Sequence, residues 1–383
     1  MKAEEPRILV RAAERLTIKQ IELIPILVPL DREYRGSYYR MSNRATIITR
    51  LYTEEGIIGT AYGADEDKTL AEIAQVIRQE IAPKLIGEDA FKYARCFDLA
   101  YPVTYDQLRD RRIGLVALAS VDFAIWDAIG KALGKPLWQL WGGARNRIPV
   151  NIIGGYYGGD LAAIREEVAK WKELGFRGCK FKVGGRPPAE DAARVQAARE
   201  TAGKDFVITI DANQGYHLHE ALELCRRLAG LGIRWFEEPC IWTNDSRDMH
   251  QVRERGGIPI CAGQSEYSPA GCRNLMEAGA IDVCNLDASW SGGSTSWLRM
   301  AAVAHAYSVE LAHHEEPQVA AHLLASQPHG TYVEVFHPNR DPIWWNLIAN
   351  RPPIVDGEMT LPQSPGFGWE LDWDFASRHR VDK

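Results

Sequence analysis

The chain has 383 residues and a mass of 43.0 kDa, more than one compact core normally holds, so we expect one large domain and a smaller one. Hydrophobic residues make up 46% and charged residues 25% of the chain, as in an ordinary soluble protein, and nothing in this composition indicates disorder. A net charge of −6 gives no basic stripe for a phosphate backbone, which excludes nucleic acid as a partner.

The cysteines and the first residues indicate where the protein works. Seven cysteines, odd in number and without a CxxC pair, argue against both a disulfide framework and a zinc site. The stretch MKAEEPRILVRAAERL carries charges where a signal peptide needs its apolar core, and no later apolar run approaches the length of a membrane span. We therefore expect a cytoplasmic protein without membrane contact.

Alternating apolar residues from about 17 to 62 predict antiparallel strands, with a hairpin turn at Glu55 and Gly56. Residues 66–134 then follow a helical pattern, and Gly134 is suited to the C-cap of the last helix. The first 145 residues are therefore expected to form an α+β domain.

After residue 146 the pattern changes to short apolar runs that alternate with amphipathic helices. The predicted strands are VNIIGG, GCKFKV, FVITID, IRWFEE, IPICAG, IDVCNLD, SVELAHH and TYVEV. One intervening helix is predicted from Leu161 to Leu174, with Asp160 as N-cap and Gly175 as the stop. Eight such runs predict a βα barrel over residues 146–340. An open doubly wound sheet is the alternative, but no glycine-rich phosphate loop follows the first strand.

The tail, residues 341–383, is too irregular for another barrel unit, and we expect it to return to the N-terminal domain.

Reactive side chains lie at the ends of six successive barrel strands, spaced one βα unit apart. They are Lys180 and Lys182, Asp211, Glu237, Gln264 or Glu266, Asp287, and His314. A buried unpaired carboxylate is costly, so acids that recur at one mouth imply a shared cation. Oxygen ligands without cysteine or clustered histidine favour Mg²⁺.

The two lysines of KFK alternate along a strand, so both can point into the mouth while Phe181 faces the helices. His314 can donate a ring N–H to Asp287. A metal, a lysine and a His–Asp pair suit removal of the proton next to a carboxylate, because cations stabilise the resulting enediolate. A lysine base needs a lowered pKa, which a neighbouring lysine and a metal would both favour.

The motifs KFK, DAN, FEEP, NLDASWSGG and AHHEEP, in this order and spacing, resemble those of the mandelate racemase subgroup of the enolase superfamily. The segments SVDFAIWDAIGKALGKPLWQLWGG and PGFGWELD are similar to its capping domain, so the resemblance spans nearly the whole chain. It implies a modified (β/α)7β barrel, which is an α/β fold, with an α+β capping domain formed by the N-terminal segment and the C-terminal tail. The superfamily uses a Lys or His base with Mg²⁺.

The resemblance also implies roles for individual residues. Lys182 would be the base, Lys180 would lie beside the substrate carboxylate, and His314 with Asp287 would be the opposite acid or base. Asp211 and Glu237 would bind Mg²⁺, with Asn213 near the site. Gln264 departs from the pattern, because it occupies the slot of an acidic third ligand. If residues 264–266 stay extended, Gln264 and Glu266 share a face, and we expect Glu266 to supply the third negative charge. The alternative is that Glu266 caps the helix that begins near Ser268.

These residues predict Mg²⁺-dependent dehydration of a sugar acid to a 2-keto-3-deoxy acid by a lyase. The alternatives are a racemase or epimerase of a 2-hydroxy acid and a barrel that binds an acid sugar without turnover. The segment 31–43 is the expected lid, and Tyr38, Tyr39 or Arg40 would touch the distal end of the substrate, unless they are ordinary surface side chains. His313 remains open as a substrate contact, although alternation along a strand lets only one of His313 and His314 face the mouth. We expect a small carboxylate substrate and a homo-oligomer.

Overall fold

The first part of the described chain is an antiparallel sheet packed against helices. The computed structural model describes residues 14–382, so the charged first residues used above lie largely outside it. The strands are β1 (Ile18–Arg35), β2 (Arg40–Thr53) and β3 (Ile58–Gly63), paired in that order. The turn at Glu55 and Gly56 is confirmed: Gly56 has a φ of +82°, in the region that glycine adopts without strain.

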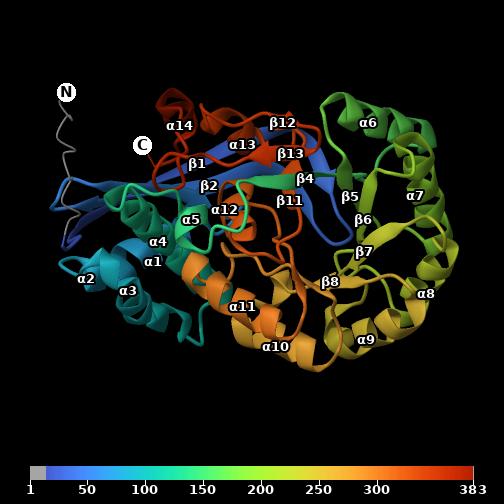
Figure 1. The fold of residues 1–383 in the computed structure, drawn as a ribbon, viewed down its shortest axis with the longest axis horizontal. Coiled ribbons are helices and arrows are strands. Elements are labelled where there is room, and N and C mark those ends of the chain that lie inside the picture. Colours follow the sequence, from blue (N-terminus) through green and yellow to red (C-terminus); the bar gives the residue numbers. More distant parts are fainter. Residues whose placement is uncertain (1–13, 383) are drawn as a thin grey trace, which may run out of the picture.

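Helices follow the strands of this capping domain, and those over residues 70–85 and 111–132 pack against its sheet (Figure 1). The helices are α1 (Leu70–Val76), a π-helical turn (Ile77–Ile81), α2 (Ala82–Leu85), α3 (Tyr93–Ala100), α4 (Arg111–Ala132) and α5 (Leu137–Leu140). Gly134 follows the end of α4 with a φ of +63°, as predicted. By length and composition α4 could cross a membrane, so the expectation that no apolar run is long enough was wrong. Its apolar stretch is entirely buried inside the protein.

Residues 147–336 form the predicted barrel of eight parallel strands. The strands are β4 (Arg147–Gly154), β5 (Gly178–Lys182), β6 (Val207–Asp211), β7 (Ile233–Glu237), β8 (Ile260–Ala262), β9 (Val283–Cys284), β10 (Glu310–Leu311) and β11 (Val333–Phe336). Between them run α6 (Leu161–Glu173), α7 (Pro188–Ala202), α8 (Leu218–Arg227), α9 (Asp245–Gly256), α10 (Pro269–Glu277), α11 (Ser294–Ala306) and α12 (Pro317–Ser326). Strands β4 to β10 pair in chain order, β11 pairs with β4, and Leu311 of β10 forms a parallel bridge with Gly330, just before β11. Seven βα units and a last strand confirm the (β/α)7β fold.

Local sequence signals explain where the barrel helices begin and end. The Asp160 side chain accepts a hydrogen bond of 2.9 Å from the Ala163 N–H, which caps α6, and Gly175 follows this helix with a φ of +90°. The helices surround the strands as an outer ring (Figure 1). Because all eight strands are parallel, their C-terminal ends meet at one mouth, which is where barrel enzymes place functional groups.

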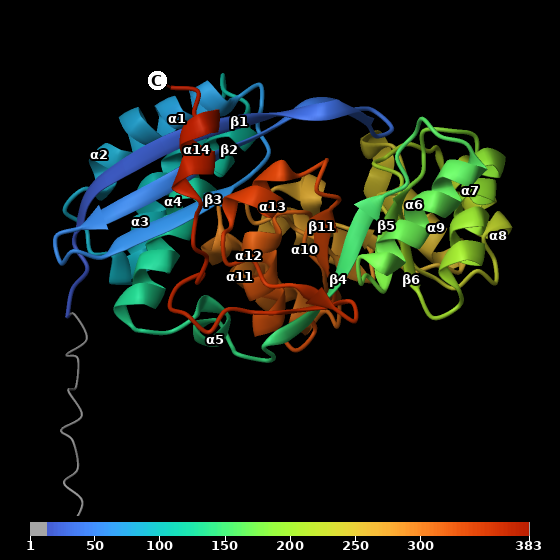
Figure 2. The same cartoon turned by 90° about the horizontal axis from the view of Figure 1, so that it is seen from above.

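The C-terminal tail contacts both parts of the molecule. It contains α13 (Pro342–Leu347), β12 (Ile354–Val355), β13 (Glu358–Thr360) and α14 (Trp373–His379). The Val381 N–H donates a 3.1 Å hydrogen bond to the Pro25 carbonyl of β1, while β13 pairs with the start of β4. Figure 2 shows α14 on β1, and β1 extending from the capping sheet across the barrel. The predicted division at residues 145 and 340 stays a prediction.

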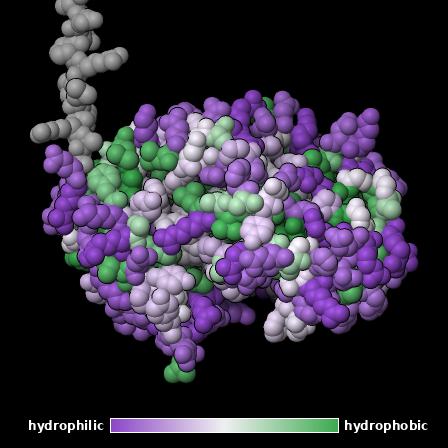
Figure 3. All heavy atoms as spheres, turned by 60° about the horizontal axis from the view of Figure 1, so that its bottom comes forward, coloured by the Kyte–Doolittle hydropathy of each residue, from purple (hydrophilic) through white to green (hydrophobic). Residues whose placement is uncertain are grey.

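A buried group of charges joins the capping domain to the barrel. We call it the interdomain cluster, and it comprises Arg44, Arg340, Asp65, Glu315, Glu316 and Asp341. Arg44 of β2 is 2% exposed and lies 2.7 Å from Asp65, 2.9 Å from Glu316 and 3.2 Å from Asp341. The outer surface has no such concentration of one kind of side chain on the face drawn in Figure 3, where polar and apolar side chains are interspersed.

Candidate active site

Two buried lysines and three carboxylates meet at the C-terminal ends of the barrel strands. We call them the mouth cluster: Lys180, Lys182, Asp211, Glu237 and Glu334. Lys180 Nζ lies 2.8 Å from Glu334 and 3.1 Å from Glu237, and Lys182 Nζ lies 2.6 Å from Asp211. Both lysines leave β5 on the same face, as the alternation of a strand predicts. Each of the five residues is at most 4% exposed.

The electrostatics of the lysines differ from the expectation. Burial opposes the charged form of Lys182, but the Asp211 carboxylate outweighs it and raises the pKa of the ammonium. Burial likewise opposes the charged form of Lys180, and Glu237 and Glu334 raise its pKa well above the usual value. Lys180 does lower the pKa of Lys182, as predicted, but the ion pair with Asp211 at 2.6 Å outweighs this effect, so the net change in the pKa is upward.

Glu237 has an oxygen with no partner. Its Oε1 accepts hydrogen bonds from Lys180 and from Asn285 Nδ2 at 3.0 Å, whereas its buried Oε2 has none. Burial, together with the negative charge of Asp211, raises the pKa of Glu237 to about 8. When all three carboxylates of the mouth cluster are ionised they face two ammoniums, so one negative charge is left over. An additional cation would stabilise both the charge and the orphaned oxygen.

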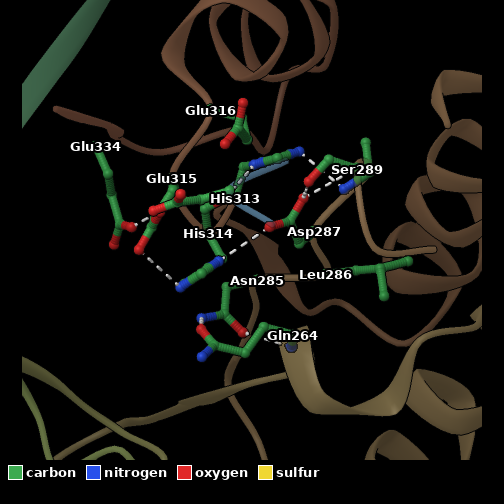
Figure 4. Close-up of polar contacts among 12 residues, drawn as sticks. Gln264, Asn285, Leu286, Asp287, Ser289, His313, His314, Glu315, Glu316 and Glu334 are labelled. Atoms are coloured by element: carbon green, nitrogen blue, oxygen red, sulfur yellow. Dashed lines mark hydrogen bonds and ion pairs between the residues drawn. The ribbon is translucent and has the colours of Figure 1, made fainter. Parts of the chain in front are cut away.

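Gln264 points into this site and Glu266 does not. The Gln264 amide oxygen accepts a 3.1 Å hydrogen bond from Asn285, the same side chain that contacts Glu237 (Figure 4). The expected extended backbone was wrong: Gln264–Glu266 forms a 3-10 turn. As a result Glu266 lies over the first turn of α10, where a Cβ added to Gly271 would be 2.5 Å from its Oε2. Ser268 caps that helix.

The His–Asp pair forms as predicted. His314 Nδ1 lies 2.9 Å from Asp287 Oδ2, and Asp287 also accepts hydrogen bonds from Ser289 (Figure 4). Burial opposes protonation of His314, but Glu315 and Asp287 together raise its pKa to about 9. His313 is turned away from the mouth, because its Nε2 accepts a 3.0 Å hydrogen bond from the Ala288 N–H. We therefore withdraw His313 as a substrate contact.

A cavity of about 460 Å³ separates the mouth from the capping domain, and Lys182, Asn213, Gln264 and His314 all line it. Asn213 accepts a 3.0 Å hydrogen bond from Lys182. The cap contributes the following side chains to the lining: Tyr39, Arg40, Met41, Asn43, Asp65, Glu66, Asp67, Lys68, Thr69 and Arg112. Most of the expected lid belongs to β1 and β2, and its tip places Tyr39, with its ring centre 5.8 Å from Lys182 Nζ, at the cavity. Tyr38 is 74% exposed and does not line it.

Three acids near the site were not predicted from the residues at the strand ends. Glu334 lies within β11 rather than at its end, although an acid in an otherwise apolar run was a visible signal. Glu238 follows Glu237, and its buried carboxylate accepts a 2.6 Å hydrogen bond from Ser265 and one of 3.3 Å from the Gln264 amide nitrogen. Glu315 lines the cavity beside His314.

The residues present fit a hard divalent cation. In the part of the chain that the structure describes, no three His, Cys, Asp or Glu side chains gather as a metal site. Two carboxylates and one amide oxygen do lie close together, because Lys180 contacts both Asp211 and Glu237, and Asn285 bridges Glu237 to Gln264. This all-oxygen set, with its orphaned Glu237 oxygen, suits Mg²⁺ rather than a thiophilic metal.

Comparison with known proteins agrees with this geometry. Residues 163–375 match the enolase C-terminal domain-like family, and residues 27–142 match the mandelate racemase/muconate lactonizing enzyme N-terminal domain. Arabinonate dehydratase of Saccharolobus solfataricus is 30% identical over 85% of this chain and 88% of its own. N-succinyl-L-Arg/Lys racemase of Bacillus cereus is 28% identical over 94% of this chain and 96% of its own.

A solved mandelate racemase/muconate lactonizing enzyme from a marine actinobacterium, in complex with magnesium, is 57% identical to the chain. It superposes with a TM-score of 0.91 over 96% of this chain and 100% of its own. Both family matches, which together cover most of the chain, fall on the two parts that the fold separates. The chain therefore belongs to the enolase superfamily, in the mandelate racemase/muconate lactonizing enzyme subgroup.

Proposed function

We propose that the protein is a Mg²⁺-dependent dehydratase that converts a sugar acid to a 2-keto-3-deoxy acid through an enediolate. The observation that carries the proposal is that Lys182 and His314 line one cavity, with the carboxylate of Asp211 beside Lys182 and that of Glu237 beside Lys180. An ammonium on one side and a histidine held by an aspartate on the other suit proton removal at C2 and loss of the 3-hydroxyl.

Asp211, Glu237 and the amide oxygen of Gln264 would hold the magnesium ion. A bound Mg²⁺ would supply positive charge next to the substrate carboxylate and would share the Asp211 charge that now holds the Lys182 proton. Glu238 fixes the orientation of the Gln264 amide, because it accepts a hydrogen bond from the nitrogen, and the oxygen, which accepts one hydrogen bond from Asn285, has a second lone pair for the cation. Glu266 is not part of this set.

The remaining steps belong to the side chains. Lys182 takes the C2 proton while Lys180 lies beside the substrate carboxylate and stabilises its growing negative charge. The C3–O bond breaks as His314 gives its proton to the departing hydroxyl, which leaves as water, and the enol product tautomerises to the 2-keto acid. Asp287 holds His314 in the tautomer that presents Nε2 to the cavity.

Racemisation or epimerisation of a 2-hydroxy acid is the second candidate. The same two residues could deprotonate and reprotonate one carbon, because β5 and β10 are separated around the barrel by β4 and β11. The relative from Bacillus cereus is a racemase, whereas the relative from Saccharolobus solfataricus is a dehydratase. The cytoplasmic location and the homo-oligomer stay predictions.

The test is a library of aldonic and aldaric acids incubated with the protein and Mg²⁺ in D2O. A dehydratase gives deuterium exchange at C2 and a 2-keto product. A racemase gives exchange with inversion at C2 and no 2-keto product, and a binding protein gives neither. His314→Asn should retain C2 exchange but lower 2-keto formation by roughly 10²- to 10⁴-fold, as for a lost general acid. His219→Asn, which changes an exposed histidine, is the matched control. An equal rate of product formation in both variants would contradict the role of His314.

A further inference from the structure

Glu315 is an acidic side chain in the cavity wall that the proposed chemistry does not use. Both Glu315 and Glu316 have left-handed backbone conformations, with φ of +49° and +48°, which non-glycine residues adopt only where their surroundings impose it. The Glu315 N–H is held by Glu334, to which it donates a 3.0 Å hydrogen bond. The turn thereby projects the Glu315 side chain beside His314 instead of into the helices (Figure 4).

The Glu315 carboxylate is kept charged. Its Oε1 lies 3.4 Å from His314 Nε2 and its Oε2 lies 3.7 Å from Arg44 of the capping domain. Burial favours the neutral acid, but His314, Arg44 and Arg340 outweigh it and lower the pKa of Glu315. At neutral pH this group is therefore an ionised carboxylate, which can only accept hydrogen bonds.

Its capacity to accept hydrogen bonds is unfilled. Within residues 14–382, no N–H or O–H group lies within ordinary hydrogen-bond distance of the Glu315 carboxylate, whose two ion contacts are longer than 3.2 Å. The side chain is 14% exposed and lines the cavity. Each of the other three acids of the cavity accepts a hydrogen bond at its carboxylate: Glu66 from Arg112 and Thr69, Asp67 from Asn43, and Asp65 from the Ala45 N–H, while the second oxygen of Asp65 lies 2.7 Å from Arg44.

We propose that Glu315 determines specificity by accepting a hydrogen bond from the substrate hydroxyl that His314 protonates. This inference rests on the proposed function. A donor placed between Glu315 and His314 Nε2 must be a neutral hydroxyl, because a carboxylate there would be repelled by Glu315. The substrate carboxylate therefore lies toward Lys180 and Lys182, and its 3-hydroxyl toward Glu315. The site selects 2,3-dihydroxy acids over acids that lack the 3-hydroxyl.

The experiment pairs two substrates with three variants. The probes are the sugar acid with the fastest C2 exchange in the library and its 3-deoxy form, whose exchange needs no departing hydroxyl. Glu315→Gln should lower kcat/KM for the sugar acid by roughly 10- to 100-fold, as for the loss of a charged hydrogen bond, mainly through KM. C2 exchange of the 3-deoxy acid should change by less than about 2-fold, because its missing hydroxyl makes no such contact.

Glu316→Gln is the matched control, since Glu316 shares the turn and contacts Arg44 but does not line the cavity. It should leave the preference for the sugar acid over the 3-deoxy acid unchanged. Glu315→Asp keeps the charge and should recover part of that preference, and it replaces Glu315→Gln if thermal unfolding shows that variant to be misfolded. Equal losses on both acids in the Glu315 variants would overturn the inference. Absence of exchange with every acid in the wild type would instead overturn the proposed function.

Discussion

The mouth cluster and the interdomain cluster both bury several charges, yet they use different cations. The mouth cluster pairs its acids with lysines, whose ammonium can lose a proton. The interdomain cluster pairs its acids with arginines, whose planar guanidinium stays charged and contacts several carboxylates at once. Both clusters reach the cavity of about 460 Å³, the mouth cluster through Lys182 and the interdomain cluster through Asp65 and Glu315, but Arg44 and Arg340 do not line it and are at most 2% exposed. We therefore expect buried charge to provide reactivity in the first cluster and fixed geometry in the second.

The largest effect is expected from a substitution that disrupts the mouth cluster. Lys182→Ala should lower turnover by roughly 10²- to 10⁴-fold, because it removes the proposed base, while the fold stays intact since Lys180 still lies 3.6 Å from Asp211. Turnover and circular dichroism measure the two effects. Lys170→Ala, which changes an exposed lysine on α6, should leave both unchanged. Near-normal turnover in Lys182→Ala would remove this residue from the mechanism.

The second prediction breaks the interdomain cluster. Arg44→Met should lower the free energy of unfolding by about 3–5 kcal/mol, because Glu316 and Asp341 would lose the cation that they contact and Asp65 would keep only Arg340. Urea unfolding measures this change. Arg50→Met is the control on the same strand, where a partly exposed pair with Glu22 should contribute less than about 1 kcal/mol. Losses of equal size would mean that Arg44 is no more important than a surface arginine.

The third prediction concerns the pH dependence of the interdomain cluster. Burial, opposed by Arg44, raises the pKa of Glu316 from an ordinary 4.5 to about 7. The folded protein then binds more protons than the unfolded chain between these values, so the free energy of unfolding falls as pH rises from about 4.5 to 7. The Glu316 contribution is at most roughly 3 kcal/mol. Glu316→Gln should flatten this slope in urea unfolding at pH 5 and pH 8. An unchanged slope would show that Glu316 is ionised throughout.

The prediction with the smallest expected effect tests which of Gln264 and Glu266 belongs to the metal site beside the mouth cluster. Gln264→Ala should weaken Mg²⁺ binding by roughly 10-fold, measured by calorimetry, since it removes an oxygen beside Glu237. Glu266→Gln should change the affinity little, because the 3-10 turn directs that side chain over α10. The reverse order would return the third negative charge to Glu266.

The strand period was predictable from the sequence because each βα unit has a similar length, and this placed Lys182, Asp211, Glu237, Asp287 and His314 at one mouth. The direction of Glu266 was not predictable, because a single 3-10 turn after a short strand rotates the side chain away, and no residue type in QSE demands that turn. The contacts of Glu315 were not predictable either.

Besides its neighbour His314, Glu315 contacts Arg44, which lies on a capping strand more than 250 residues earlier in the chain. Contacts between domains follow from how the two surfaces meet, and no local pattern around Arg44 or Glu315 indicates them. The left-handed conformation of two consecutive glutamates is likewise imposed by the surroundings, because local preference opposes it. Resemblance to a family could supply the catalytic residues but not this contact.

The C-terminal tail contacts β1 at two places, through the hydrogen bond of Val381 and through the β-bridge between Ile26 and Arg380. These contacts have a consequence for synthesis on the ribosome. The first strand of the capping domain is synthesised more than 300 residues before the helix α14 that packs on it. All eight barrel strands are complete before that helix is made. The contact between β1 and α14 therefore becomes possible only after every barrel strand has been synthesised, and we expect nascent chains that stop before α14 to expose the face of β1 that it covers.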